Sequence, residues 1–416
     1  MQNQNDASAV ASPKNSPFES IWLLLIGGFF AHLWLIYTGL HGIGTPMGDI
    51  LFAYQPWVQY MLDAHRLLGI NADWVYPYPA MIPMWASALL NPNDFQAGWL
   101  TIITILDLIL ISMIAGVGRR DENTAARFGA AWFWLFFLVA LGPVSISRVD
   151  AFSVAIALFG VLALAARKLS TSTAWFTVGT AMKIWPAGIL ITAMASSKYR
   201  WRILAAAAAT GLAIIAIGFL LGGNMSMFSF LSNQANRGLQ IESPAATPFI
   251  WSWILGLSNN EIYYDNLMMT FQVAGVGALA IANLLSAAMF VAIAITAWLT
   301  WRAAKAGANF RTIMPIAVLT ATLDLIVFNK VGSPQFVTWL AVPIILGVLY
   351  RAQNWRLPMF AVVAIALLTN LVYPVFYDDI LKGNAGAFAV LTLRNLVYLA
   401  LLVWANLRLS SLAKRQ

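Results

Sequence analysis

The chain has 416 residues, of which 61% are hydrophobic and only 10% are charged. Soluble domains carry about 25% charged residues, so this composition excludes a soluble protein and indicates a polytopic α-helical membrane protein. The sequence has no cysteine, which excludes disulfides, thiol catalysis and thiolate metal sites. The net charge of +8 does not require a nucleic-acid partner, because basic residues of membrane proteins collect in cytoplasmic loops.

Polar residues gather at the two ends of the chain. Residues 1–17 are rich in Ser, Asn and Gln, and we expect a disordered cytoplasmic tail there, followed by an uncleaved anchor. Residues 18–408 form the expected transmembrane domain, since no polar stretch within them is long enough to fold alone. We expect residues 409–416 to form a basic cytoplasmic tail.

Apolar stretches recur along the whole chain, and they predict an all-α bundle of about 10–13 transmembrane helices. The expected spans are 20–40, 98–117, 127–142, 150–166, 202–222, 272–300, 312–328, 335–350, 357–376 and 387–407. The stretch 170–197 is apolar but is interrupted by Lys183 and Pro186, and basic residues flank both of its ends. We therefore expect two short helices, 172–183 and 186–196, that meet near Lys183.

With the N-terminus inside, most of the 24 basic residues fall on the cytoplasmic side, as the positive-inside rule requires. The exceptions lie on or near the outer face together with most of the acids: Arg66, Arg148, Lys183, Arg237, Lys330, Lys382 and Arg394. Charges at span ends are costly, so their concentration on one side indicates a functional face.

The first outer loop carries a lone carboxylate, Asp49, followed by an amphipathic stretch that runs to Leu68. Aromatic and aliphatic side chains share one helical side of this stretch and polar ones the other, which predicts an interfacial helix on the outer face. The stretch Tyr76 to Pro79 alternates Tyr and Pro and should be extended. The apolar stretch 80–90 is too short to cross the bilayer.

Asp49 admits two interpretations. Aspartate is favoured at helix N-caps, where its side chain accepts a backbone hydrogen bond. A carboxylate at the edge of a membrane can instead act as a general base that takes a proton from an attacking hydroxyl.

Further polar residues adjoin the ends of the next spans. Arg148 and Asp150 could form a local salt bridge that orders a turn, or Arg148 could clamp a phosphate. Lys183 lies between two apolar half-helices, where a cation is costly unless it meets an anion or its side chain reaches the interface. We favour an anion for Lys183.

Two outer loops add polar clusters. One reads Arg-Gly-Leu-Gln-Ile-Glu-Ser from Arg237 to Ser243, within a loop long enough to suggest function. The other reads Lys-Val-Gly-Ser-Pro-Gln from Lys330 to Gln335. We expect Tyr377-Asp378-Asp379 to be a solvated turn.

Other polar residues fit structural roles. We expect Asp107 and Asp324, both within spans, to pack against polar partners. His32, His41 and His65 lack metal-ligand spacing, and no nucleotide-binding glycine loop or Asp-x-Asp pair is present. We therefore expect no metal and no cofactor.

These motifs together resemble the GT-C membrane glycosyltransferases, and in particular glycosyltransferase family 87. The likeness rests on the outer-loop carboxylate, the Tyr-Pro motif, Arg148 with Asp150, Lys183-x-x-Pro186, Gln240 to Ser243 and Lys330-x-x-Ser333-Pro334-Gln335. The resemblance implies a polyprenyl-phosphate sugar donor and a single inverting displacement without a covalent intermediate. Asp49 would then be the base. Lys183, Arg237, Lys330 and Arg148 would bind the donor phosphate. The acceptor and sugar would contact Tyr54, Tyr76, Tyr78, Asp150, Gln240, Glu242, Ser333 and Gln335.

The expected reaction transfers a sugar, with mannose first and arabinofuranose as the alternative, to a glycolipid or cell-envelope glycan acceptor. It would take place on the outer face of a bacterial plasma membrane, with both termini in the cytoplasm. A lipid or glycan transporter is the rival from another class, because discontinuous helices and charges within the membrane also mark transporters. An inactive scaffold of a glycan-synthesis complex is a third interpretation.

Overall fold

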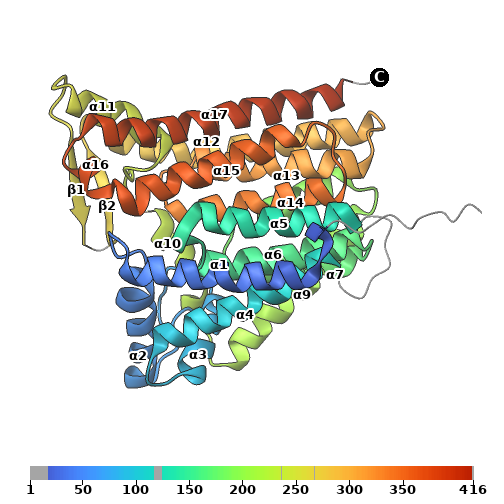
Figure 1. Cartoon of the computed structure of the whole chain (residues 1–416), viewed down its shortest axis with the longest axis horizontal. Coiled ribbons are helices and arrows are strands. Elements are labelled where there is room, and N and C mark those ends of the chain that lie inside the picture. The colour runs from blue at the N-terminus through green and yellow to red at the C-terminus, as the bar shows by residue number, and fades with distance from the viewer. Residues whose placement is uncertain (1–16, 117–123, 236, 267, 415–416) are drawn as a thin grey trace, which may run out of the picture.

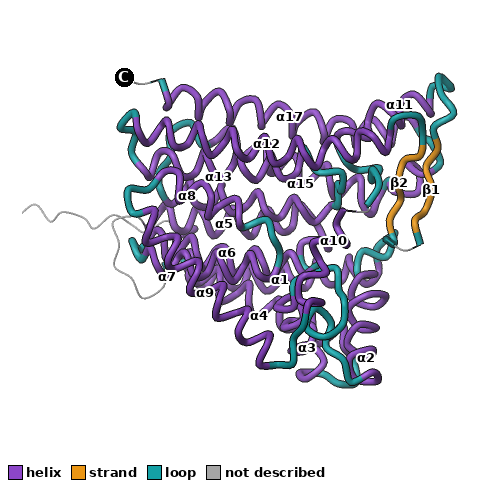
Figure 2. Tube along the Cα trace, turned by 180° about the vertical axis from the view of Figure 1, so that it is seen from behind, coloured by secondary structure: helices purple, strands orange, loops and turns teal. Residues whose placement is uncertain are grey.

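The computed structural model describes residues 17–116, 124–235, 237–266 and 268–414. Long helices run side by side along the molecule, and short helices and one hairpin gather at one end of them (Figure 1, Figure 2). The expected N-terminal tail lies outside the described residues except for its last residue, Pro17. Most of the expected C-terminal tail is instead helical, because α17 continues past Arg408 to Ala413. The structure is an all-α polytopic bundle, as the composition predicts.

In the part of the chain that the structure describes, eight helical segments are long and apolar enough to cross a membrane. They are α1 (Ile21–His41), α4 (Phe95–Ala115), α5 (Thr124–Leu141) with η4 (Gly142–Ser145), α9 (Arg200–Leu220), α12 (Ala278–Lys305), α13 (Phe310–Val327), α15 (Arg356–Asn370) with η8 (Leu371–Val375), and α17 (Ala385–Ala413). Three shorter apolar segments complete the bundle: α6 (Val149–Ala165), α8 (Ala187–Ser196), and η7 (Pro334–Leu340) with α14 (Ala341–Leu349).

The helices differ in how much of their apolar surface the protein itself covers. Within the most apolar stretch of each helix, protein atoms bury 78% of α5 with η4 and of α13, but only 11% of α9 and of α12. Exposed large side chains such as Leu212 on α9 and Phe290 on α12 need an apolar solvent. The bundle therefore has a protein-packed centre and a periphery suited to lipid.

The stretch 170–197 folds into two short helices, which confirms the prediction. Helix α7 (Leu169–Met182) packs on α6 and α9, and α8 packs on α12 and α13. The backbone of Lys183 between them is extended, with φ −154° and ψ 131°. Pro186 precedes α8 with φ −66°, which suits the start of a helix.

Short elements cover the end of the bundle at which α1 finishes. They are η2 (Ile50–Tyr54), α2 (Gln55–Ala64), η3 (Tyr78–Ala80), α3 (Met81–Leu90), η5 (Met225–Phe228), α10 (Ser229–Ala235), η6 (Pro244–Ala246), α11 (Thr247–Ile254) and α16 (Tyr377–Leu381). A further short helix, η1 (Pro17–Glu19), precedes α1 at the opposite end. We call the end covered by the short elements the loop end. Helix α17 ends where α1 begins, at the opposite end (Figure 1).

Three sequence expectations need correction at the loop end. Helix α2 stops at Ala64, before the expected Leu68, because His65 adopts a left-handed conformation with φ +51°. Pro77 is extended, but Tyr78–Ala80 form a 3-10 turn, which a proline in the first helical turn favours. Residues 270–274 form a strand, so α12 begins only at Ala278 and not at 272.

That strand, β2 (Thr270–Ala274), pairs antiparallel with β1 (Glu261–Asp265), with Tyr263 opposite Gln272. The hairpin packs with α11, α16 and the start of α17 around a small apolar core that includes Leu239, Ile250 and Phe388. Sequence reasoning missed this hairpin, since the strand merges into the apolar run of α12.

The two acids within the bundle have polar partners, as expected. Asp107 lies 3.0 Å from His32 Nε2, and Asp324 accepts a hydrogen bond from Thr296 at 2.6 Å.

Candidate active site

Asp49 and Arg148 form an ion pair at the loop end, and the pair fastens the first outer loop to the start of α6. Arg148 Nε lies 3.1 Å from Asp49 Oδ2. Arg148 Nη1 also donates to the carbonyl oxygen of Pro46 at 3.0 Å, and the Ser147 hydroxyl donates to the same oxygen at 2.9 Å. Burial would lower the pKa of Arg148, but the Asp49 carboxylate and neighbouring tyrosines raise it. The guanidinium is therefore a permanent charge that orients Asp49.

Asp49 does not cap a helix. Its backbone is already helical, with φ −60° and ψ −32°, and its side chain makes no capping hydrogen bond. The carboxylate side chain is 41% exposed, whereas that of Arg148 is 6% exposed. Asp49 is thus held from the protein side and open on the other, which leaves it available to a ligand.

Asp150 and Lys183 form the second ion pair. Lys183 Nζ donates to Asp150 Oδ2 at 2.5 Å, and Trp339 Nε1 donates to the other carboxylate oxygen at 2.7 Å. The expected local bridge between Arg148 and Asp150 is therefore wrong. Arg148 precedes α6 in an extended conformation while Asp150 lies in its first turn, and each pairs across the fold instead.

Aromatic rings surround the Lys183 ammonium. Nζ lies 5.4 Å from the ring centroids of Tyr76 and Phe336 and 5.9 Å from that of Trp339. Trp339 stacks on Trp185, whose centroid is 5.5 Å away. Such rings attract a cation with their π faces and keep water from it. Sequence analysis named Tyr76 but missed Phe336 and Trp339, although both follow the Lys330 to Gln335 motif at helical spacing.

The three predicted tyrosines have different positions. The Tyr54 hydroxyl accepts a hydrogen bond from Val149 N at 3.2 Å, and its ring stacks on Trp99 at 4.8 Å. Tyr78 donates to the carbonyl oxygen of Ile214 on α9 at 2.7 Å. Both hydroxyls thus have structural partners, and Tyr76 is the tyrosine that faces Lys183. Burial raises the pKa of Tyr76, and the charges of Lys183 and, more weakly, Arg237 oppose that rise.

The two outer polar motifs are joined to each other. Gln240 Oε1 accepts hydrogen bonds from Gly332 N at 3.0 Å and from the Ser333 hydroxyl at 3.5 Å. Gln240 N donates to the Lys330 carbonyl oxygen at 3.0 Å, and Ser243 Oγ donates to that of Asn329 at 2.7 Å. Gln335 is half-buried and accepts a bond from Thr338 at its backbone oxygen. We call the contact between residues 240–243 and 329–333 the loop junction.

Arg237 and Lys330 are two further cations at the loop end. We call the rings of Tyr76, Phe336 and Trp339 around Lys183 the aromatic cage. Burial lowers the pKa of Lys330, and the charge of Arg237 lowers it further. Arg237 Nε is buried without a hydrogen-bond partner among the described residues. The charge of Arg237 also opposes the rise in the pKa of Tyr76, whose ring lies 5.4 Å from the Lys183 ammonium. Buried like charges repel each other, so this arrangement favours an anionic ligand.

Glu242 is the most deeply buried of the predicted site carboxylates outside α6, at 2% exposed. Its Oε2 has no hydrogen-bond partner among the described residues. Burial raises its pKa to about 7, and the nearby Arg394 opposes the rise. Arg394 donates its hydrogen bond to the backbone oxygen of Glu242. Glu242 thus belongs to the 240–243 segment of the loop junction, and its carboxylate is buried.

No group of three or more His, Cys, Asp or Glu side chains placed to hold a metal ion occurs within the described ranges. The site holds a half-exposed carboxylate, Asp49, paired with Arg148, and a second ion pair of Lys183 with Asp150.

Comparison with known proteins identifies one family. No curated protein matches the chain. The model of Glycosyltransferase family 87 matches residues 74–323, which contain Arg148, Asp150, Lys183, Gln240 and Glu242. Since this match covers more than half of the sequence, the chain belongs to glycosyltransferase family 87.

Proposed function

We propose that the protein is an inverting glycosyltransferase that moves mannose from a polyprenyl-phosphate donor to a glycolipid or cell-envelope glycan on the outer face of the bacterial plasma membrane. One observation carries the proposal. The half-exposed Asp49 carboxylate and the cations Lys183, Arg237 and Lys330 gather at the same end of a family 87 chain. That end would face away from the cytoplasm, with both termini inside.

The chemistry follows from these groups. The acceptor hydroxyl gives its proton to Asp49 while its oxygen attacks the anomeric carbon of the donor sugar. The bond between that carbon and the phosphate oxygen breaks, and the electron pair leaves with a polyprenyl phosphate. Lys183, Arg237 and Lys330 would stabilise the charge that develops on this leaving group. One displacement inverts the configuration at the anomeric carbon.

The exterior of the bundle supports a lipid donor. Helix α9 exposes a continuous apolar surface, and its Ile214 carbonyl oxygen accepts the bond from Tyr78. Tyr78 lies two residues after Tyr76, and the Tyr76 ring faces Lys183. A lipid lying along α9 would therefore end near the cations. A soluble sugar nucleotide has no hydrocarbon chain that could contact this apolar surface.

The test is transfer from polyprenyl-phosphate mannose to membrane acceptors by the Asp49→Asn variant. An amide keeps the size of the carboxylate but takes no proton at neutral pH, so turnover should fall by a factor of ~10²–10⁴. Donor binding and expression should remain, since an amide oxygen can still accept a hydrogen bond from Arg148. Turnover close to that of the wild type would remove Asp49 from the base role.

Asp63→Asn is the matched control. Asp63 lies exposed on α2 and contacts only Gln59 among the hydrogen bonds of the described residues. Its variant should retain full turnover. Parallel assays with polyprenyl-phosphate arabinose identify the sugar, and transfer of arabinose alone would refute the choice of mannose.

A further inference from the structure

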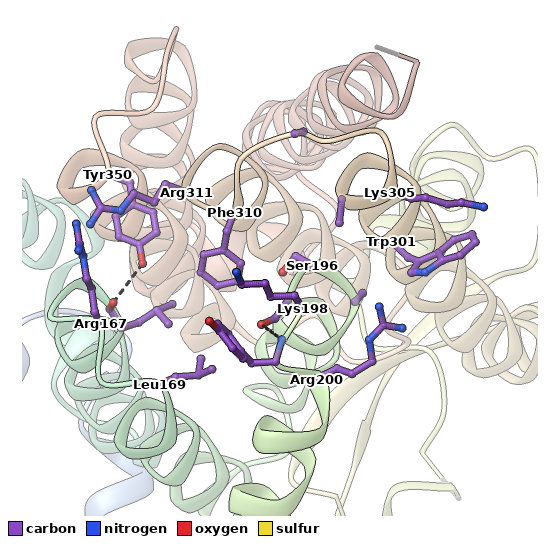
Figure 3. A pocket seen from close by; sticks show the side chains of 16 residues that line it. Arg167, Leu169, Ser196, Lys198, Arg200, Trp301, Lys305, Phe310, Arg311 and Tyr350 are labelled. Carbon is purple, nitrogen blue, oxygen red and sulfur yellow. Dashed lines mark hydrogen bonds between the residues drawn. The ribbon is translucent and has the colours of Figure 1, made fainter. Parts of the chain in front are cut away.

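A second charged region lies at the end of the bundle opposite Asp49. A cavity of about 530 Å³ opens there between the ends of α6, α8, α12 and α14 and the starts of α7, α9 and α13 (Figure 3). Helix α6 connects the two regions, since its first turn holds Asp150 and Arg167 follows its last turn. Its 17 residues span about 25 Å, so a ligand in this cavity cannot touch Asp49.

Among the described residues, the lining of this cavity includes several cations and no acid. Five basic side chains come to it from the start or end of several helices: Arg167, Lys198, Arg200, Lys305 and Arg311. Within the described ranges, none of the five makes a salt bridge with a carboxylate. Figure 3 shows these side chains arranged around one opening. These exposed cations together make a positive potential at the cavity that attracts an anion.

Aromatic rings support three of these cations. Lys198 Nζ lies 5.1 Å from the ring of Tyr199, and Lys305 Nζ lies 5.3 Å from that of Trp301. The Arg311 guanidinium lies 5.5 Å from the ring of Tyr350. These contacts limit the freedom of long side chains that would otherwise extend into solvent. All five cations are exposed, and the ring contacts give three of them a preferred position at the cavity.

Apolar side chains make up much of the remaining lining. Leu164, Leu169 and Phe310 contribute to the wall, and the Tyr350 hydroxyl donates to the carbonyl oxygen of Leu164 at 3.4 Å. The cavity lies where apolar helices end, which is the depth of lipid headgroups in a bilayer. A cationic rim on an apolar wall matches a phosphate with acyl chains attached.

We propose that this cavity binds the phosphate headgroup of an anionic phospholipid from the leaflet opposite the proposed active site. The inference does not depend on the transferase chemistry, because the cavity shares no residue with the Asp49 region. Free phosphate offers the same charge, but the apolar wall and the position at the helix ends favour the lipid. The expected occupant is therefore a membrane lipid such as phosphatidylglycerol.

The first test measures binding of phosphatidylglycerol and of phosphatidylcholine to the whole protein in neutral detergent by native mass spectrometry. The wild type should bind phosphatidylglycerol at least tenfold more tightly. The double variant Lys198→Gln/Arg311→Gln should lose that preference. The control Arg302→Gln/Arg356→Gln removes the same charge at the same end but outside the cavity, and it should retain the preference. If both variants lose the preference for phosphatidylglycerol equally, the preference reflects the general surface charge, and the proposed site is overturned.

A second measurement does not depend on removing any cation. The chain has no cysteine, so Ala195→Cys places a unique thiol in the cavity wall. Phosphatidylglycerol should slow its reaction with a neutral maleimide at least fivefold, whereas Ala306→Cys, outside this cavity, should react at an unchanged rate. Protection by inorganic phosphate alone at the same concentration would assign a soluble anion and overturn the lipid proposal. Absence of protection by either would overturn the site.

Discussion

Substitutions at Lys183 separate a role in donor binding from a role in stabilising the fold. Its ammonium donates to Asp150, whose side chain is 1% exposed, and among the described residues the only other hydrogen bond to that carboxylate comes from Trp339. Lys183→Ala therefore removes one of two donors from a buried negative charge. Removing one partner of a buried ion pair typically costs about 3–5 kcal/mol of folding free energy. We expect the thermal midpoint of Lys183→Ala to fall accordingly.

The same variant should also weaken donor binding. A charge-assisted hydrogen bond to a buried phosphate is worth roughly 1.5–3 kcal/mol, and about 1.4 kcal/mol corresponds to a tenfold change in affinity. Binding of a polyprenyl-phosphate sugar, measured by titration in detergent, should thus weaken more than tenfold.

The double variant Lys183→Ala/Asp150→Asn separates the two effects. It removes the uncompensated charge, so stability should return most of the way to that of the wild type. Donor affinity should stay low, because no ammonium is restored. If donor affinity returns together with stability, Lys183 serves only to hold Asp150, and the proposed phosphate contact is refuted. Asp150→Asn alone measures how much the pair contributes.

Three further predictions follow from other parts of the molecule. A Cβ at Gly332 would lie 2.2 Å from a backbone nitrogen of the loop junction, so Gly332→Ala should destabilise the protein by about 1–3 kcal/mol in denaturation. Gly211→Ala, which meets nothing within 4 Å, is its control and should not destabilise. Because burial raises the pKa of Glu242 to about 7, its proton is retained on folding, and stability should decline as pH rises from about 4.5 to 7. Glu242→Gln should flatten that decline in pH-dependent melting curves, and an unchanged profile would contradict it. A cysteine at Ser232 should react with impermeant maleimide in intact cells, whereas one at Ser411 should react only after permeabilisation; the reverse pattern would invert the proposed topology.

The local properties of the sequence determined the class of fold and most of its helices. Hydropathy is a property of a short stretch, so the spans were predictable within a few residues at most of their ends. The division near Lys183 was also predictable, because basic flanks and Pro186 act locally. The same locality explains the error at 272, where β2 continues into the apolar run of α12 and only pairing with β1 marks it as a strand.

The partners of the charged residues were decided by the tertiary structure. Sequence proximity suggested that Arg148 would pair with Asp150, but the turn into α6 separates the two side chains, and each meets a residue distant in the chain. Asp49 shows the same point, because its capping and catalytic interpretations differ only in where its carboxylate points. The aromatic cage around Lys183 and the cationic cavity at the far end each join side chains from several helices. Such sites depend on helix packing, which no single stretch of the sequence encodes.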